Sequence, residues 1–581
     1  MNPKPGKNEK NGVRGTKGTE HEHEQENGNK SKAKRAWGKE PSATRGEPGH
    51  AARPSADHAR VGILDFGSQY GQLIARRVRE VGLLSEIFPP DASVETLRAR
   101  GVRAVILSGG PDSAHTAGAR RVDPSLYRSG LAVLGICYGA QRMAQDLGGR
   151  SGSGEHGEFG PATLTRVVPG RGLPDESGPA LRLLEDLPNC ATVWMSHADR
   201  VLELPPEFEN LASTPGAPLA AFAHRRLPLA AVQFHPEVAH TERGLEILRR
   251  FLTDGAGLTP DWELSGWVDD AVQSLWQAMP EGRAIVALSG GVDSAVAAAL
   301  AARAVGDRLT AVFVDHGLLR RGEGDSVMES MGRLGVRVRR VDAADRFLPH
   351  LRGVTDPEEK RRRIGRDFGE VLRVAAEEEA QGGARYLVQG TLYPDVVESG
   401  QGQSAVIKTH HNVGALPEDL GLKVVEPLRL LFKDEVRQVG EILGLPPSMV
   451  HRQPFPGPGL AVRIAGEVTP ERLHLLRECD ARVTEELERM TPEDGEPGLF
   501  QFFAVLLPEA RAVGVLGDQR LYGYPVVLRA VTSEDAMTAR AARIPWQVLE
   551  HLSVRLPNEV PGVTRVLYDL TTKPPGTIEW E

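Results

Sequence analysis

A glycine-rich turn joins a short apolar run to an alanine-rich run between residues 284 and 302. Residues 284–288 read Ala-Ile-Val-Ala-Leu, which is typical of a buried strand. Residues 295–302 are almost all alanine, and so favour a helix. The turn between them therefore leads from a strand into a helix N-terminus. Its two glycines allow close backbone approach and the helix dipole favours negative charge, so the junction predicts an anion site.

The side chains of this turn suit phosphate groups. Ser289 and Ser294 add hydroxyl donors, and Asp293 is able to orient them or to bind a Mg²⁺ ion carried by the phosphates. No Gly-Lys-Ser/Thr follows the glycines, so the pattern is not of the Walker type. The alternative interpretation is a tight strand-to-helix turn without a ligand.

The string Ser-Gly-Gly-Val-Asp-Ser resembles the pyrophosphate loop of the ATP pyrophosphatase superfamily. Members of that superfamily cleave ATP between its α and β phosphates and leave AMP on an oxygen of the substrate. The resemblance implies ATP binding by Ser289, Gly290, Gly291, Val292, Asp293, Ser294 and Ala295, with Asp293 also the candidate metal ligand.

The overall composition excludes several classes of protein. With 581 residues, 40% of them apolar, the chain is long enough for about three domains. A net charge of -8 argues against a mainly nucleic-acid-binding role. No apolar run is long enough to span a bilayer, and the N-terminus lacks the apolar core of a signal peptide. Three scattered cysteines form neither a disulfide framework nor a zinc motif, which favours the cytosol.

The N-terminal segment, residues 1–58, contains almost no large apolar side chains. Such a segment buries too little surface to offset its ordering entropy, so we expect it to be disordered. Its His-Glu-His-Glu string at residues 21–24 admits a metal-binding interpretation, and a solvated charged tail is the alternative.

From residue 60 onward short apolar runs alternate with helical patterns. Apolar runs at residues 61–64, 104–107 and 132–136 predict strands, and residues 69–81 have helical periodicity. This alternation predicts an α/β domain with a largely parallel sheet, whose sites lie at the carboxyl ends of the strands.

A cysteine and a histidine each follow one of these predicted strands. Cys137 lies between small residues in Gly-Ile-Cys-Tyr-Gly, a pattern that resembles a nucleophile elbow, where the helix N-terminus favours the thiolate. Another predicted strand, beginning at residue 230, ends in His235-Pro236-Glu237. A thiol needs a base, and the base needs a carboxylate to hold its ring, so Cys137, His235 and Glu237 are the candidate catalytic residues. Taken singly, the cysteine and the histidine have purely structural interpretations.

This set resembles the class I glutamine amidotransferases, which hydrolyse glutamine to glutamate and ammonia through a thioester. The resemblance implies an oxyanion site formed by the N–H groups of Gly110, in Ser-Gly-Gly-Pro, and of Tyr138. The string at residues 195–200 also matches a family segment, except that Ala198 replaces the usual glycine. We interpret His197 in that string as a structural residue or a contact to another domain.

The middle of the chain continues the α/β pattern. A linker is predicted at residues 253–259, followed by a helix over 261–279 whose tryptophans we interpret as packing residues. Strands are predicted at residues 309–314 and 386–391. The polar string at 407–414 suggests a lid over a phosphorylated substrate, or else a solvated loop. The basic cluster at 360–363 is either an anion-steering patch or a solvated helix face.

The last region starts near residue 454. Residues 455–463, Phe-Pro-Gly-Pro-Gly-Leu-Ala-Val-Arg, predict a fixed turn entering a strand. Further strands are predicted at 524–531 and 566–570. The C-terminal string at 571–581 contains paired prolines, a lysine and a threonine, which suggests a pre-shaped anion-binding loop.

Several of these strings together resemble the glutamine-hydrolysing GMP synthase family. They are residues 393–399, 408–414, 455–463 and above all 573–581. The resemblance implies two successive parallel-sheet α/β domains, the first of the class I amidotransferase type and the second of the pyrophosphate-loop type, followed by a smaller α+β dimerisation domain. The implied division is a tail at 1–58, an amidotransferase domain at 59–253, a synthetase domain at 254–453 and a dimerisation and XMP-binding domain at 454–581.

The same resemblance implies an enzyme that makes GMP, AMP, pyrophosphate and glutamate from XMP, ATP and glutamine. Its implied cofactors are ATP and Mg²⁺, with no tightly bound organic cofactor. Arg320, Lys573 and Glu579 are the implied XMP contacts. The implied state is a cytoplasmic homodimer, joined through the C-terminal domain, with no nucleic-acid or membrane partner.

Two other functions remain to be compared with this one. A tRNA-thiolating pyrophosphate-loop enzyme requires a basic face and reactive cysteines in the synthetase half, where only Cys479 is found. A non-catalytic regulatory protein on the same folds predicts the loss of the nucleophile, the base or the phosphate loop, and all three are present.

Overall fold

Three sheets organise the part of the chain that the computed structural model describes. That part comprises residues 58–68, 70–167, 178–400, 421–490, 498–516, 519–533 and 538–581, without the side chains of 155–156, 398–400 and 516. The predicted tail, apart from residue 58, and the predicted lid at 407–414 lie outside it. Among the described residues, no helix is both long and apolar enough to cross a membrane.

The first sheet has the strand order β2-β1-β3-β4-β9-β8-β7-β5-β6. Strands β2 to β9 in this order pair in parallel, and the rest of the sheet is antiparallel. The strands are β1 (Arg60–Leu64), β2 (Leu84–Phe88), β3 (Val102–Leu107), β4 (Ala132–Ile136), β5 (Arg150–Arg166), β6 (Cys190–Glu203), β7 (Phe208–Ser213), β8 (Ala221–His224) and β9 (Leu229–Val232), and the helices are α1 (Gly71–Glu80), α2 (Val94–Ala99), α3 (Tyr138–Asp146) and α4 (Gly244–Arg250).

Both faces of the parallel part of this sheet are buried. Ile63 and Ile106 belong to one apolar cluster, and Leu64 and Val105 belong to another. Successive side chains of a strand point to opposite faces, so strands that are apolar throughout need cover on both sides. This explains why the predicted strands appear as continuous apolar runs, and it leaves only the strand ends for polar groups.

The second sheet is parallel throughout and has the order β12-β11-β10-β13-β14. Because the chain leaves β10 toward β11 and returns to the other side at β13, the topological switch point lies between β10 and β13. The elements are β10 (Arg283–Leu288), β11 (Leu309–Asp315), β12 (Val338–Asp342), β13 (Ala384–Val388), β14 (Lys423–Val425), α5 (Leu264–Ala278), α6 (Val292–Val305), α7 (Glu323–Arg333), α8 (Ala344–Leu351), α9 (Pro357–Gln381), α10 (Tyr393–Gly400), α12 (Lys433–Ile442) and α13 (Pro447–Val450).

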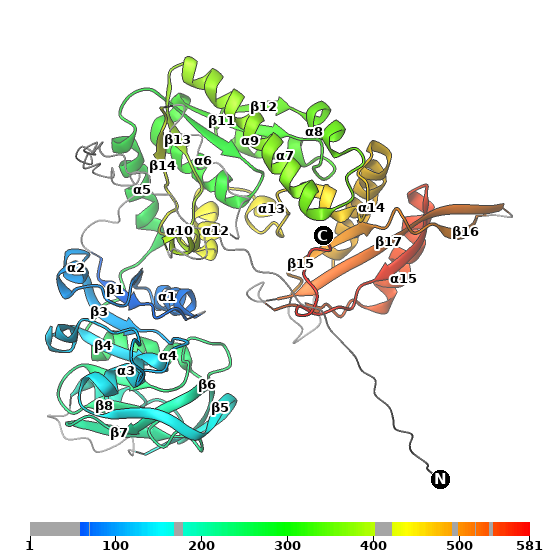
Figure 1. The fold of residues 1–581 in the computed structure, drawn as a ribbon. Coiled ribbons are helices and arrows are strands. Elements are labelled where there is room, and N and C mark those ends of the chain that lie inside the picture. The colour runs from blue at the N-terminus through cyan, green and yellow to red at the C-terminus, as the bar shows by residue number, and fades with distance from the viewer. Residues whose placement is uncertain are drawn as a thin grey trace, which may run out of the picture. The chain divides into compact units, whose positions relative to one another are not determined.

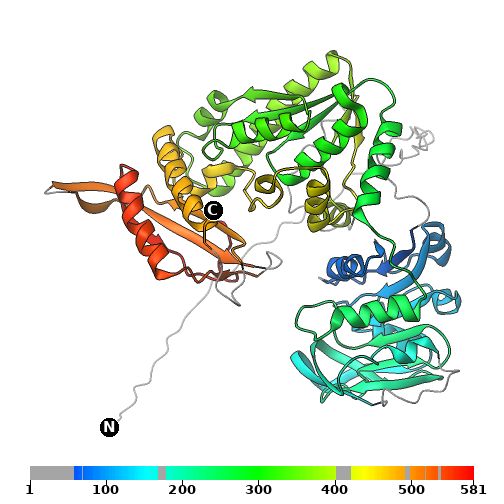
Figure 2. The ribbon, with the colours of Figure 1, turned by 180° about the vertical axis from the view of Figure 1, so that it is seen from behind.

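Helices cover both faces of the second sheet, as Figures 1 and 2 show from opposite sides. Phe313 on β11 packs into the cluster that includes α6, whereas its neighbours Val312 and Val314 pack into a cluster that includes Ile364 on α9. The second of these clusters also contains C-terminal residues such as Leu476, so the second sheet and the C-terminal region share a core.

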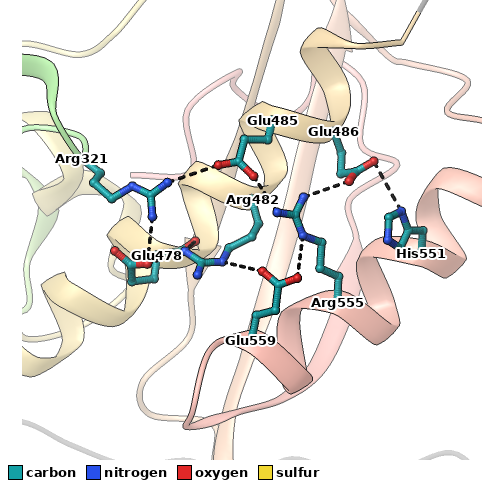
Figure 3. Close-up of polar contacts among 8 residues, drawn as sticks. All are labelled: Arg321, Glu478, Arg482, Glu485, Glu486, His551, Arg555 and Glu559. Carbon is teal, nitrogen blue, oxygen red and sulfur yellow. Dashed lines mark hydrogen bonds and ion pairs between the residues drawn. The ribbon is translucent and has the colours of Figure 1, made fainter. Parts of the chain in front are cut away.

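The C-terminal region is built on the long strand β17, which pairs with β15, β16, β18 and β19. Figure 3 shows a charge network that links its two helices: Arg555 on α15 contacts Glu485, Glu486 and Glu559, with Glu485 and Glu486 on α14. The elements are β15 (Gln501–Leu506), β16 (Ala512–Leu516), β17 (Gln519–Thr532), β18 (Arg540–Ala541), β19 (Val563–Tyr568), α14 (Pro470–Glu488) and α15 (Trp546–Glu559).

Three local predictions are wrong. Residues 455–463 do not enter a strand, because Gly459–Arg463 forms a short 3₁₀ helix whose start is held by the hydrogen bond from Leu460 N to Leu318 O. The predicted linker at 253–259 is partly helical, since a π-helical turn over Phe251–Gly255 continues α4. Of the three tryptophans predicted to be packing residues, Trp262 and Trp267 are buried, so that prediction is wrong only for Trp276. Trp276 is 59% exposed, because the buried face of α5 carries Trp267, Ala271 and Leu275.

Candidate active sites

Cys137 occupies a strained turn between β4 and α3. Its φ is 52° and its ψ is -104°, a conformation that non-glycine residues rarely adopt, and its side chain is buried. The neighbouring glycines are required by crowding: a Cβ atom at Gly135 would lie 2.7 Å from Gly139 O, and one at Gly139 would lie 2.4 Å from Leu107 O. The turn therefore has the geometry of a nucleophile elbow.

Sheet pairing places the candidate base beside the candidate nucleophile. Strands β4 and β9 are parallel neighbours with Ile136 opposite Val232, so Cys137 and His235 lie at the same edge of the sheet. His235 Nδ1 lies 2.7 Å from Glu237 Oε1 in a buried pair. Burial opposes the charged imidazolium, but the Glu237 carboxylate and a hydrogen bond with Cys137 outweigh it and hold the pKa of His235 well above 6.5. The arrangement suits an imidazolium that is oriented and stabilised by a carboxylate.

The loop after β3 approaches the same edge. A Cβ atom at Gly109 would lie 3.3 Å from His235 Cε1, and one at Gly110 would lie 3.4 Å from Tyr138 Cγ. Gly139 N donates to Ser108 O at 3.0 Å, which ties this loop to the start of α3. The two residues predicted to form the oxyanion site, Gly110 and Tyr138, therefore lie next to each other.

His197 is buried behind this site. Its Nε2 lies 3.6 Å from Glu158 Oε2, and burial lowers the pKa of His197. It lies on β6, and neither ring nitrogen has a hydrogen-bond partner among the described residues, so its interpretation as a structural residue or a contact to another domain stays a prediction.

Residues 289–295, which we call the phosphate-type loop, lie at the carboxyl end of β10, next to the switch point. Gly290 has a φ of +75°, which favours glycine, and Ser294 Oγ accepts from Ser289 N at 3.2 Å. A Cβ atom at Gly390, after β13, would lie 3.1 Å from the carbonyl carbon of Asp293. The loop is thus shaped by its own hydroxyls and confined by the neighbouring strand end, and its glycines and the N-terminus of α6 remain suited to an anion.

Asp293 and Lys433 form an ion pair at this loop. Lys433 Nζ lies 2.5 Å from Asp293 Oδ2. The other carboxylate oxygen, Oδ1, is buried and has no hydrogen-bond partner among the described residues. A buried carboxylate oxygen without a donor is suited to a cation.

A second polar cluster surrounds the ring of Phe455; we call it the Phe455 cluster. It consists of Phe455, Arg320, Arg452, Arg463, Glu323, Asp480 and Glu579. The guanidinium carbons of Arg320, Arg452 and Arg463 lie 4.9, 5.3 and 5.1 Å from the ring centroid. Arg320 Nε lies 3.2 Å from Asp480 Oδ2, and Glu579 accepts from Arg463 at 3.0 and 3.1 Å. The structure therefore brings together Arg320 and Glu579, two of the predicted XMP contacts.

Lys573, the third predicted XMP contact, lies on the C-terminal loop. Its backbone pairs with Ala539, and Arg529 donates to the carbonyls of Thr571 and Thr577 on either side of it, at 2.6 and 3.0 Å. The loop is thus held by a buried arginine.

Sequence reasoning missed several residues at these sites. Lys433 and Arg452 lie outside the strings singled out above, and their only signal is a cation near an otherwise apolar or proline- and glycine-rich segment. Arg463 ends the string at 455–463, but the sequence assigned it no role. The basic cluster at 360–363 has two interpretations, an anion-steering patch or a solvated helix face. Its first member, Lys360, fits neither of them. Lys360 is fully buried, donates to Ile464 O at 2.6 Å and pairs with the Glu581 carboxylate.

Comparisons with known proteins agree with this geometry. The model of the family "Glutamine amidotransferase class-I" matches residues 62–254, and that of "GMP synthase C terminal domain" matches residues 488–580. The cysteine elbow, the buried His–Glu pair and the first match define the N-terminal α/β region as a class I glutamine amidotransferase.

Curated relatives extend the similarity over nearly the whole chain. A "GMP synthase [glutamine-hydrolyzing]" from Parafrankia sp. is 55% identical over 93% of this chain and 99% of its own length. Proteins with the same description from Thermobifida fusca and Symbiobacterium thermophilum are 52% and 51% identical over 91% and 89% of this chain, and 99% and 98% of their own lengths. The chain belongs to the family of glutamine-hydrolysing GMP synthases, and it is an enzyme.

Proposed function

We propose that the chain converts XMP, ATP and glutamine into GMP, AMP, pyrophosphate and glutamate. The observation that carries the proposal is the presence, in one chain of this family, of a Cys137–His235–Glu237 constellation and of a phosphate-type loop at the switch point of a second parallel sheet. Glutamine hydrolysis and nucleotide chemistry thus have separate sites.

At the first site, Cys137 attacks the glutamine amide as the thiolate. His235 carries the proton of the thiol and passes it to the leaving ammonia, while Glu237 holds the ring in position. The N–H groups of Gly110 and Tyr138 stabilise the oxyanion of the tetrahedral intermediate. Water then cleaves the thioester and releases glutamate.

At the second site, residues 289–295 bind the phosphates of ATP. The XMP oxygen attacks the α phosphorus, pyrophosphate leaves, and ammonia then displaces AMP from the adenylated carbon to give GMP. Mg²⁺ fits here because Asp293 Oδ1 is a buried carboxylate oxygen without a partner among the described residues, and this ion is commonly held by one carboxylate together with phosphate oxygens. When bound, the ion neutralises phosphate charge during the displacement.

XMP binding is assigned to Arg320, Lys573 and Glu579. In support, Arg320 has a buried Nη2 without a hydrogen-bond partner among the described residues, which is a donor left over for a ligand. The proposed division is an amidotransferase domain at 59–253, a synthetase domain at 254–453 and a C-terminal domain at 454–581. The family matches at 62–254 and 488–580 support the first and the last.

We also propose a homodimer that forms through the C-terminal domain. Large apolar side chains are exposed on β16, β17, β19 and α15, and such a surface favours burial against a second copy. They are Val513, Val515, Tyr522, Trp546, Val554 and Leu567. Val515→Lys with Tyr522→Lys is expected to give a monomer by light scattering. We assign the enzyme to the cytoplasm, since Cys137, Cys190 and Cys479 are all free thiols.

The reaction is tested with wild type and Cys137→Ala, each given XMP, ATP and Mg²⁺ with either glutamine or ammonium. We expect the variant to lose the glutamine-driven formation of GMP and to keep the ammonium-driven formation. No GMP from wild type with either nitrogen source would refute the substrate assignment. Loss of both activities in a folded variant would refute the assignment of Cys137.

A further inference from the structure

Arg452 connects two loops that follow different strands of the second sheet, β10 and β11. Its Nη1 donates to Gly290 O, in the phosphate-type loop after β10, at 2.9 Å. Its Nη2 donates to Glu323 Oε1, at the start of α7, at 2.5 Å. The side chains of Arg452 and Glu323 are 19% and 7% exposed, so this link is largely shielded from water.

Glu323 extends the link to Arg320. Its second carboxylate oxygen, Oε2, accepts from the backbone N–H of Arg320 at 3.0 Å. One glutamate therefore joins Arg452 to the loop that follows β11. The connection runs from the Gly290 carbonyl through Arg452 and Glu323 to Arg320, and every step is a direct hydrogen bond.

The planar guanidinium is well matched to this position. It donates in two directions from one rigid fork, and its central carbon lies 5.3 Å from the centroid of the Phe455 ring that Arg320 and Arg463 also contact. A lysine at this place has neither the fork nor the planar face. The Phe455 ring thus limits the freedom of the same guanidinium that holds the two loops.

We propose that Arg452 is a positioning residue, which sets the phosphate-type loop and the Arg320 loop in the mutual arrangement that the adenylation step requires. The proposal rests on the assignment above of ATP to residues 289–295 and of XMP to Arg320. In this role Arg452 touches neither substrate. It acts by aligning the attacking XMP oxygen with the α phosphorus, and alignment of this kind is lost with small displacements.

The test compares Arg452→Gln, Arg452→Lys and Glu323→Gln in ammonium-driven GMP formation, with KM measured separately for ATP and XMP. We expect Arg452→Gln to lower kcat about a hundredfold while each KM changes less than about threefold. The kcat of Arg452→Lys is expected to stay within about tenfold of that of Arg452→Gln. A lysine keeps the positive charge but lacks the forked guanidinium, so it does not restore the bonds to both Gly290 and Glu323. The double variant Arg452→Gln with Glu323→Gln is expected to have a kcat no lower than that of Arg452→Gln alone.

Arg333→Gln is the matched control, since Arg333 is 72% exposed and pairs only with its own helix neighbour Glu329 among the contacts described for it. It is expected to behave as wild type. A kcat retained within about threefold in Arg452→Gln would overturn the proposal. So would a rise in the KM of one substrate with unchanged kcat, which would make Arg452 a direct ligand. Additive effects of the two glutamine substitutions would exclude the route through Glu323. If wild type itself formed no GMP, the proposed function would fail before any variant was compared.

Discussion

Lys433 Nζ lies 2.5 Å from Asp293 Oδ2, although 140 positions separate the two residues in the chain. The contact joins the N-terminus of α12 to the phosphate-type loop. It neutralises one carboxylate oxygen of Asp293 and leaves Oδ1 buried without a hydrogen-bond partner among the described residues. The loop therefore combines a cation with a carboxylate oxygen that is suited to a metal ion.

Removal of this cation is expected to weaken ATP binding. In Lys433→Met, Asp293 loses its partner and its full negative charge faces the triphosphate. We expect the KM for ATP in ammonium-driven synthesis to rise about tenfold, which corresponds to about 1.4 kcal/mol. Lys423→Met, at an exposed lysine on β14, is the control. An unchanged KM for ATP in Lys433→Met would show that this lysine does not tune the loop.

Glu237→Gln is expected to show what the carboxylate of Glu237 contributes at the glutaminase site. Burial remains in the variant but the carboxylate is lost, so the pKa of His235 should fall from its raised value. In wild type, the stability that this raised pKa contributes is present below pH 6.5 and is lost as pH rises through the folded-state value. The variant should lack that pH dependence.

The glutamine-driven rate of Glu237→Gln is expected to fall about a thousandfold, because the neutral amide no longer stabilises the imidazolium and also permits the wrong tautomer of the ring. The ammonium-driven rate serves as the internal control and should be retained. NMR of the histidine rings measures the pKa of His235 directly. A pKa of His235 that does not change in the variant would contradict the role given to Glu237.

His316, which follows β11, should make the protein less stable in mild acid. Burial lowers the pKa of His316 from 6.5 to about 4, and its Nδ1 accepts from Leu318 N at 3.1 Å. Its folded-state pKa is depressed, so the unfolded state binds more protons as pH falls below 6.5. We expect His316 to account for a loss of about 2 kcal/mol in the free energy of unfolding between pH 7 and pH 5.

His316→Asn keeps an acceptor for Leu318 N and removes the titrating ring. Urea unfolding at pH 7 and pH 5 measures the difference between the variant and wild type. His224→Asn, at the partly buried last residue of β8, provides a comparison at a less buried histidine. Equal pH dependence in wild type and His316→Asn would rule out His316 as the group responsible.

The buried pair of Lys360 and Glu581 is expected to hold the C-terminus. Lys360 is fully buried, and burial lowers the pKa of Lys360 while Glu581 favours its charge. Lys360→Met leaves Glu581 without its cation and should lower the free energy of unfolding by about 3 kcal/mol. Arg362→Met, on the exposed side of the same helix at 67% exposure, should cost little. Equal stability of the two variants in denaturant titrations would contradict this role of Lys360.

Local patterns in the sequence are enough to predict the strand-to-helix junctions of this protein. The runs at 104–107 and 284–288 are strands in the structure, and the turns after the apolar runs at 132–136 and 284–288 lead into α3 and α6 as expected. These features depend on neighbouring residues, since apolar runs, glycine and helix propensity act within a few positions. The general placement of sites at strand ends follows from the same parallel pattern.

Other features were decided by packing between distant segments. Local stiffness suggests a turn and a strand at 455–463, yet Gly459–Arg463 is a 3₁₀ helix because Leu318 and Lys360 take up its polar backbone groups. Trp276 on α5 is exposed, and this could not be predicted, because the neighbouring elements decide which face of the helix is covered.

The sequence alone determined which chemical groups this protein has and which short turns present them: the cysteine elbow, the His-Pro-Glu string and the Ser-Gly-Gly-Val-Asp-Ser loop. Only the tertiary structure decided how charged side chains are paired: Lys433 with Asp293, Glu581 with Lys360, and Arg452 with Gly290 and Glu323. The physical reason is that periodicity and turn chemistry are local. A charge finds its partner through the packing of sheets and helices, which depends on the whole chain at once.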